Sequence, residues 1–167
     1  MLKIGDRAPD FSLPDRNAQK VHLSNHFGRW VILYFYPRDN SPGCTMEAKE
    51  FSEHLGEFED LNAVVIGVSP DSVRSHYTFA RNNNLNILLL SDRQKKVMEQ
   101  YGSHRMKSIY GKETPTVVRS TFLINPGGNI AYIWDNVRVK GHVQEVMEKL
   151  KELKAKRRYI HKKTNKA

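Results

Sequence analysis

Five short apolar runs set the pattern of the chain. Trp30–Tyr36 and Asn62–Ser69 are almost continuously apolar and are bounded by turn residues, which is typical of strands buried on both faces. Three further runs predict short strands at Ile87–Leu90, Ser120–Ile124 and Ile130–Trp134. Together these runs predict a central sheet.

Segments with helical spacing lie between these runs. Each has apolar residues at steps of three and four, which is the spacing of one helix face. The second follows a Ser-Pro-Asp-Ser start signal, and the third follows Asp92 as its N-cap and ends at Gly102. The four apolar stripes are Ala48-Phe51-Leu55-Phe58, Val73-Tyr77-Ala80, Val97-Met98-Tyr101 and Val143-Val146-Met147-Leu150-Leu153. Strands that alternate with amphipathic helices predict an α/β domain whose sheet is at least partly parallel.

Charge divides the chain into two parts. The net charge is +9 over 167 residues, but residues 154–167 hold seven Lys and Arg and no acid. The rest is nearly neutral and contains no repeat or linker, so we expect one domain over residues 1–153 and a basic C-terminal tail over residues 154–167. A basic terminus is usually a solvated end. Within this tail only Tyr159 and His161 have rings on which bases could stack, so we do not expect a nucleic-acid partner.

Other features exclude several classes of protein. The longest apolar run, Trp30–Tyr36, is too short to span a membrane, and the N-terminal residues lack the apolar core of a secretion signal. A single cysteine excludes an internal disulfide and a cysteine-rich zinc site, and it fits a reducing compartment. His22 and His26 are four residues apart, but a turn separates them. We therefore expect a cytoplasmic protein without metal or cofactor.

The most informative segment joins the first buried run to the first helical stripe. Ser41 followed by Pro42 has the pattern of a helix N-cap and first helical residue, which places Cys44 in the first turn. Unpaired backbone N–H groups and the helix dipole stabilise negative charge at that position. The pKa of a free thiol, about 8.5, falls at such sites. Cys44 is therefore predicted to be largely thiolate at neutral pH.

Three alternatives stay open for Cys44. A lone cysteine is most often an inert buried hydrophobe, although the polar turn before Cys44 favours a reactive one. It could serve a hydrolase with His54 or His76 as base, but neither histidine lies in a recognisable motif. It could also be a redox sensor that changes a partner contact. A thiolate that reduces peroxide needs a fixed cation, which Arg119 could supply unless it is an ordinary surface arginine.

The segment around Cys44, Phe35-Tyr-Pro-Arg-Asp-Asn-Ser-Pro-Gly-Cys-Thr-Met-Glu47, resembles the active-site segment of peroxiredoxins, nearest to the bacterioferritin-comigratory-protein or peroxiredoxin Q subfamily. A second signature of that family is similar to Arg119-Ser-Thr-Phe-Leu-Ile124. Shorter matches cover most of the chain apart from the basic tail. The resemblance implies a thioredoxin-like fold, with a central mixed sheet flanked by helices, and reduction of hydrogen peroxide or organic hydroperoxides.

The resemblance also implies a role for each matched residue. Cys44 would be the nucleophile that is oxidised to sulfenic acid, and Ser41 would hydrogen-bond the peroxide. Pro37 would shield the site from water, and Arg119 would hold the thiolate and the leaving oxygen. Glu47 stands where the subfamily often has an acid, and its role stays open.

The chain departs from the family pattern in one respect, which is the cysteine that normally reacts with the sulfenic acid. Many members carry a resolving cysteine five residues after the peroxidatic one, where this chain has Lys49, and others carry it in the next helix, whereas residues 71–84 contain none. The chain is therefore predicted to be a one-cysteine enzyme whose sulfenic acid needs an external thiol of the thioredoxin or glutathione type. By analogy with the subfamily, we expect a monomer.

Overall fold

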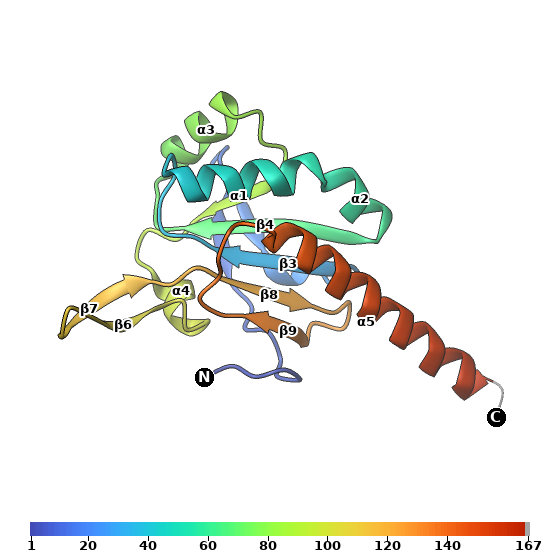
Figure 1. The fold of residues 1–167 in the computed structure, drawn as a ribbon. Helices are drawn as coiled ribbons and strands as arrows, with labels where there is room; N and C mark the ends of the chain where they lie inside the picture. The colour runs from blue at the N-terminus through green and yellow to red at the C-terminus, as the bar shows by residue number, and fades with distance from the viewer. Residues whose placement is uncertain (166–167) are drawn as a thin grey trace.

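The computed structural model describes the backbone of residues 1–165 and the side chains of residues 1–157. Each predicted apolar run contains a strand, and the predicted stripes lie on helices, the first stripe being divided between two of them (Figure 1). In chain order the elements are β1 (Ser12–Pro14), β2 (Lys20–His22), the 3-10 helix η1 (Leu23–His26), β3 (Trp30–Phe35), α1 (Pro42–Glu53), α2 (Leu55–Asp60), β4 (Ala63–Ser69), α3 (Val73–Asn82), β5 (Leu88–Ser91), α4 (Lys96–Gln100), β6 (His104–Ile109), β7 (Lys112–Val117), β8 (Ser120–Ile124), β9 (Ile130–Trp134) and α5 (His142–Asn165).

A five-stranded mixed sheet lies at the centre, in the order β5-β4-β3-β8-β9. β3 pairs in parallel with β4, and β4 in parallel with β5, whereas β8 and β9 run antiparallel to their neighbours. The register sets Phe35, the last residue of β3, opposite Ser120, the first residue of β8. Arg119 therefore lies at the same edge of the sheet as the loop that leads from β3 to α1. The predicted α/β fold with a mixed central sheet is confirmed.

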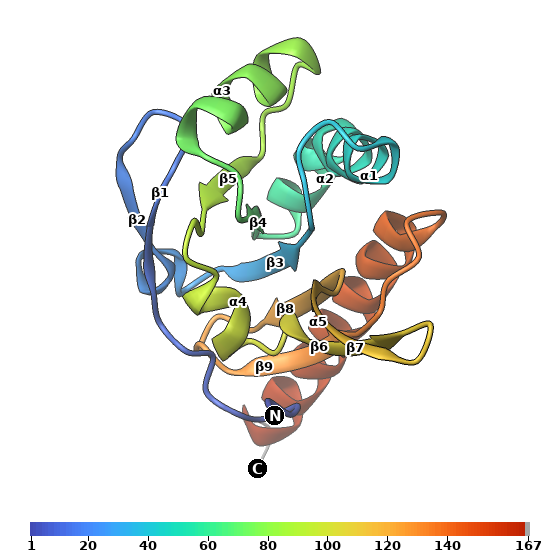
Figure 2. The ribbon, with the colours of Figure 1, turned by 90° about the vertical axis from the view of Figure 1, so that its left-hand side faces the viewer.

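The alternating side chains of β3 divide the core into two layers. Ile32, Tyr34 and Tyr36 face α1, α2, α3 and α5, whereas Leu33 and Phe35 face α4 and the N-terminal segment. Figure 2, which looks along the sheet, shows these two groups of elements on opposite sides. Cys44 belongs to the first layer, so the start of α1 is anchored by the main core.

Some predicted details were wrong or missing. The stripe from Ala48 to Phe58 is not one helix, because the chain breaks at His54 between α1 and α2. Tyr77 was expected on the apolar face of α3 but is 49% exposed, while His76 and Phe79 face the core. The two hairpins, β1–β2 and β6–β7, were not predicted, because most of their residues are polar and exposed, which leaves no alternating apolar pattern.

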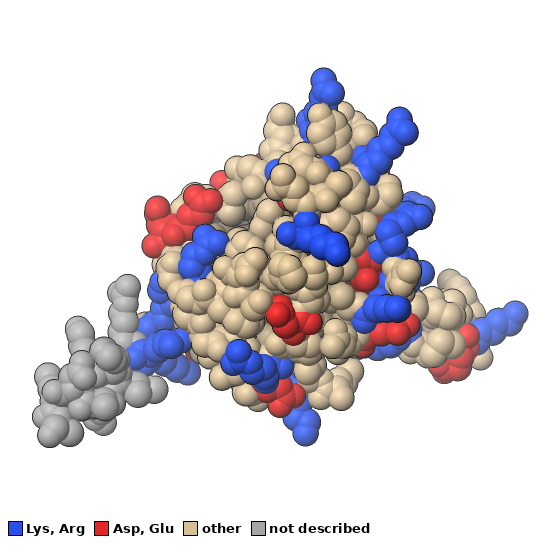
Figure 3. All heavy atoms as spheres, turned by 180° about the vertical axis from the view of Figure 1, so that it is seen from behind, with Lys and Arg blue, Asp and Glu red and all other residues tan. Residues whose placement is uncertain are grey.

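The expected boundary between domain and tail falls inside α5. The backbone of α5 continues past Leu153 to Asn165, and Lys154 Nζ donates a hydrogen bond to the carbonyl of Leu61. Figure 3 shows Lys and Arg side chains where the described part of this helix ends. The side chains of Tyr159 and His161 lie outside the described residues, so the division at residue 153 stays a prediction. Among the described residues, no helix combines the length and apolar character needed to cross a bilayer.

Candidate active site

The start of α1 has the predicted N-cap geometry. Ser41 has an extended backbone (φ −69°, ψ 149°), and its Oγ accepts a hydrogen bond from the backbone N–H of Cys44 at 3.4 Å. The same hydroxyl donates to the carbonyl of Arg38 at 3.1 Å, and Pro42 is the first helical residue. Cys44 is thus in the first turn of a helix of 12 residues, where the helix dipole favours an anion.

Cys44 is in contact with a guanidinium group from a distant part of the chain. The Cys44 side chain is free and only 1% exposed, and Arg119 Nη2 donates to its Sγ at 3.2 Å. Burial opposes the charge of Arg119, but Glu47 and Cys44 outweigh it and raise the pKa of the guanidinium further. A permanent cation therefore lies against the sulfur.

Glu47 completes the cluster from one helical turn further along α1. Its Oε1 accepts from Arg119 Nη1 at 2.7 Å, and its side chain is fully buried. Its Oε2 is buried and has no hydrogen-bond partner among the described residues. Burial raises the pKa of Glu47 to about 7, against the opposing pull of Arg119. The sequence indicated an acid here but not its partner, since the pairing depends on the register of β3 with β8.

His142 lies behind this cluster and was not singled out in the sequence. It is buried at the start of α5, and its Nε2 is 2.8 Å from the hydroxyl of Thr121 on β8. Burial and the nearby Arg119 lower the pKa of His142 to about 4. At neutral pH the ring is therefore uncharged, and Arg119 is the cation beside the sulfur.

The predicted site residues are not equally close to the sulfur. Ser41, Cys44 and Arg119 are joined by the hydrogen bonds described above. Pro37 is an exposed residue of the loop after β3, and its shielding role stays a prediction.

The hydrolase alternative lacks the geometry it requires. His54 binds Glu57 at the far end of α1, and His76 binds Asp39. None of the described histidines hydrogen-bonds Cys44 Sγ, whereas a nucleophile and its base must lie within hydrogen-bond reach.

The sequence that forms this site matches a known protein family. Residues 4–133, which include Cys44, Glu47 and Arg119, match the AhpC/TSA family. The chain belongs to this family. It is 46% identical over 149 residues to a putative peroxiredoxin bcp of Helicobacter pylori, covering 89% of this chain and 98% of that protein. It is 42% identical over 155 residues to peroxiredoxin Bcp of Bacillus subtilis, covering 93% and 99%. The predicted membership of the Bcp or peroxiredoxin Q group is confirmed.

Solved structures agree with the sequence relatives. Xanthomonas campestris peroxiredoxin Q superposes with a TM-score of 0.84 at 35% identity, covering 91% of this chain and 96% of that one. This peroxiredoxin therefore has the thioredoxin-like fold of its family and is a thiol-dependent peroxidase, an oxidoreductase that acts on hydroperoxides.

Proposed function

We propose that this peroxiredoxin reduces hydrogen peroxide and organic hydroperoxides with Cys44 as its only redox-active sulfur, and that an external thiol restores it. The observation that carries the proposal is the 3.2 Å contact between Arg119 Nη2 and Cys44 Sγ, at a helix N-terminus in a chain with one cysteine. A permanent cation in contact with the sulfur can stabilise the negative charge that a thiolate nucleophile carries and passes to the leaving oxygen. For the bacterioferritin comigratory protein of Xanthomonas campestris, the solved complexes concern alkyl peroxide reduction.

The first step is a nucleophilic displacement. The Cys44 thiolate attacks the terminal oxygen of the peroxide, so that an S–O bond forms as the O–O bond breaks. The sulfur loses two electrons and the peroxide gains them, and the departing alkoxide or hydroxide takes a proton from water. Arg119 stabilises the negative charge as it moves from sulfur to the leaving oxygen. The Ser41 hydroxyl turns to hydrogen-bond the bound peroxide, and Pro37 limits the entry of water.

The second step requires a thiol from outside the chain. An external thiolate attacks the sulfenic sulfur of Cys44, which gives a mixed disulfide and displaces hydroxide, and the hydroxide takes up a proton to become water. A second thiol then attacks this disulfide, which frees Cys44 and leaves the reductant oxidised. Lys49 lies on α1 where many relatives have the resolving cysteine, so no intrachain disulfide can form. Thioredoxin and glutathione-type thiols are the proposed reductants. The proposed setting is a monomer in the reducing cytoplasm.

Oxidation with one equivalent of peroxide tests this one-cysteine mechanism. The expected product is a monomer on non-reducing electrophoresis whose mass has grown by one oxygen and which reacts with a sulfenate probe. Excess peroxide without thiol should carry Cys44 on to the irreversible sulfinic acid. Near-complete conversion to a covalent Cys44–Cys44 dimer would refute the mechanism. Turnover with thioredoxin and, separately, with glutathione then identifies the reductant.

A further inference from the structure

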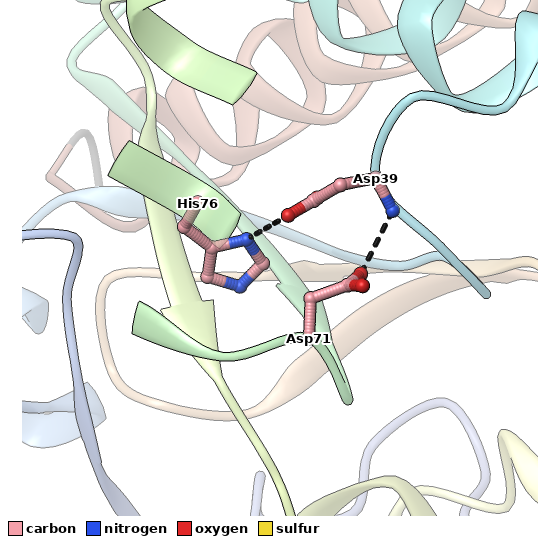
Figure 4. Close-up of side chains that lie close together, drawn as sticks. All are labelled: Asp39, Asp71 and His76. Carbon is pink, nitrogen blue, oxygen red and sulfur yellow. Dashed lines mark hydrogen bonds and ion pairs between the residues drawn. The ribbon is translucent and has the colours of Figure 1, made fainter. Parts of the chain in front are cut away.

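A second buried cluster holds the other side of the loop that precedes Cys44. Asp39 lies in this loop and is 4% exposed, and its carboxylate points toward His76 on α3 (Figure 4). Asp39 Oδ2 lies 2.8 Å from Nδ1 of His76, whose side chain is fully buried. The hydroxyls of Tyr36 and Ser75 donate to the same carboxylate at 2.7 and 2.8 Å. The backbone N–H of Asp39 in turn donates to Asp71 at 2.8 Å.

The hydrogen bonds fix the orientation of the His76 ring. Its Nε2 lies 2.9 Å from the carbonyl of Leu90, which can only accept, so Nε2 carries a hydrogen. Its Nδ1 lies 2.8 Å from Asp39 Oδ2 and 3.4 Å from the hydroxyl of Tyr36. Asp39, Asp71 and His76 are close enough to hold a cation. Both oxygens of Asp39 and Oδ2 of Asp71 already accept hydrogen bonds from protein donors, which favours a hydrogen-bonded cluster over a metal site.

The Asp39–His76 contact acts on the loop through the backbone. Asn40, the residue between Asp39 and the N-cap Ser41, has a φ of +67°, in the left-handed region that Asn adopts more readily than most residues. The chain turns sharply there, and Asp39 ties one side of the turn to α3. Leaving a buried hydrogen-bonding group without its partner is unfavourable, so the loop is held firmly.

We propose that Asp39 and His76 are positioning residues that hold the loop for peroxide attack and, by the same contact, restrict the reducing thiol. The inference rests on the proposed one-cysteine function. Peroxide is small, and its reaction gains from a fixed sulfur, N-cap and Arg119. An external thiol is larger, and Cys44 is 1% exposed, so the start of α1 must move before that thiol reaches the sulfur. Weakening the contact between Asp39 and His76 therefore slows the first step and speeds the second.

The variant His76→Gln tests this opposition of rates, with His54→Gln as the matched control. His54 is a half-exposed histidine that pairs with Glu57 away from the loop. Peroxide attack, followed in a single turnover by probe labelling of sulfenic acid, should slow about tenfold in His76→Gln. Reduction of preformed sulfenic acid by a small dithiol should become several-fold faster. In His54→Gln both rates should stay within about twofold of those of the wild type.

A milder variant covers the case in which His76→Gln does not fold. Ser75→Ala removes one hydroxyl donor to Asp39 from the surface end of the cluster and should change both rates in the same directions by a smaller factor. Unchanged rates in folded variants, or equal slowing of both steps, would overturn the proposal. If the wild-type protein itself forms no sulfenic acid, the proposed function fails instead, so the two failures are distinct.

Discussion

Two buried acid–base pairs flank the segment that carries Cys44, and they differ in how completely their hydrogen bonds are satisfied. Glu47 meets Arg119 through one oxygen and leaves the other without a described partner, beside the sulfur. Asp39 contacts His76 and also accepts hydrogen bonds from two hydroxyls, so both of its carboxylate oxygens have partners. Buried polar groups are costly when unpaired and rigidifying when satisfied. The difference fits the roles we propose, in which Arg119 of the first pair acts on the reacting atoms and the second pair holds the loop.

Removing the sulfur should have the largest effect, because it changes the Arg119 side of the site and leaves the Asp39–His76 pair unchanged. Cys44→Ser should abolish peroxide reduction, because no second thiol exists, while serine is nearly isosteric and leaves the Asp39 cluster intact. Peroxide consumption with excess thiol measures the activity, and circular dichroism checks the fold. Residual turnover above a few per cent of wild type would remove Cys44 from its assigned role.

Removing the cation of the first cluster should affect chemistry more than folding. Arg119→Met is expected to slow peroxide attack about 100-fold, the typical effect of losing one charge-stabilising donor. It should also shift the pH profile of Cys44 alkylation to higher pH. The matched control is Arg105→Met, since Arg105 forms its ion pair with Asp135. An alkylation profile identical to that of the wild type would show that Arg119 does not act on the thiolate.

The unsatisfied acid should make stability depend on pH. Because burial raises the pKa of Glu47 from 4.5 to about 7, the folded protein keeps a proton that the unfolded chain releases between these values. The contribution of Glu47 to the free energy of unfolding therefore falls as pH rises from about 4.5 to about 7. Glu47→Gln lacks this loss, so its stability relative to wild type should increase across the same window. Urea denaturation at several pH values measures the difference.

A matched comparison is needed because another group titrates in the opposite sense. The pKa of His142 is lowered from 6.5 to about 4, so its contribution to stability rises with pH over that range. This partly masks Glu47 in the wild-type profile but cancels when variant and wild type are subtracted. Glu53→Gln, an exposed acid on the same helix, should leave the relative stability flat. A flat difference for Glu47→Gln as well would contradict the assigned pKa.

The smallest effect is expected far from both clusters. Deleting residues 156–167 should leave peroxide turnover within about twofold, because the apolar stripe of α5 ends near Leu153 and Lys154 makes the last described contact with the domain. Steady-state turnover of the shortened chain tests this. A large loss with the fold preserved would place the basic tail at the site or on the reductant.

The position of Cys44 at the start of α1 was predictable from the sequence, whereas the contact between Asp39 and His76 was not. Ser41, Pro42 and Cys44 are neighbours in sequence, so local capping rules place the thiol at a helix start without any tertiary knowledge. The importance of Arg119 came from family resemblance, because its approach depends on the β3–β8 register. Asp39 and His76 are 37 residues apart, and each reads as an ordinary polar residue of a loop or a helix.

The fold was predictable wherever apolar patterning is continuous. β8 and β9 begin and end at the predicted residues, since both are short and flanked by clear turns. The β6–β7 hairpin was not predicted, because its residues are exposed apart from those at its base. Its turn has positive φ at both Tyr110 and Gly111. An apolar pattern reports buried positions, so a hairpin that buries few side chains has no such pattern.

The contact between Arg119 and Cys44 spans 75 residues, and this has a consequence for the order of events during synthesis. Cys44 leaves the ribosome well before Arg119, and the two meet only when β8 adds to the edge of β3. Until then the nascent chain has no cation beside the sulfur. The groups that surround the sulfur in the folded protein are therefore complete only late, as a product of sheet assembly.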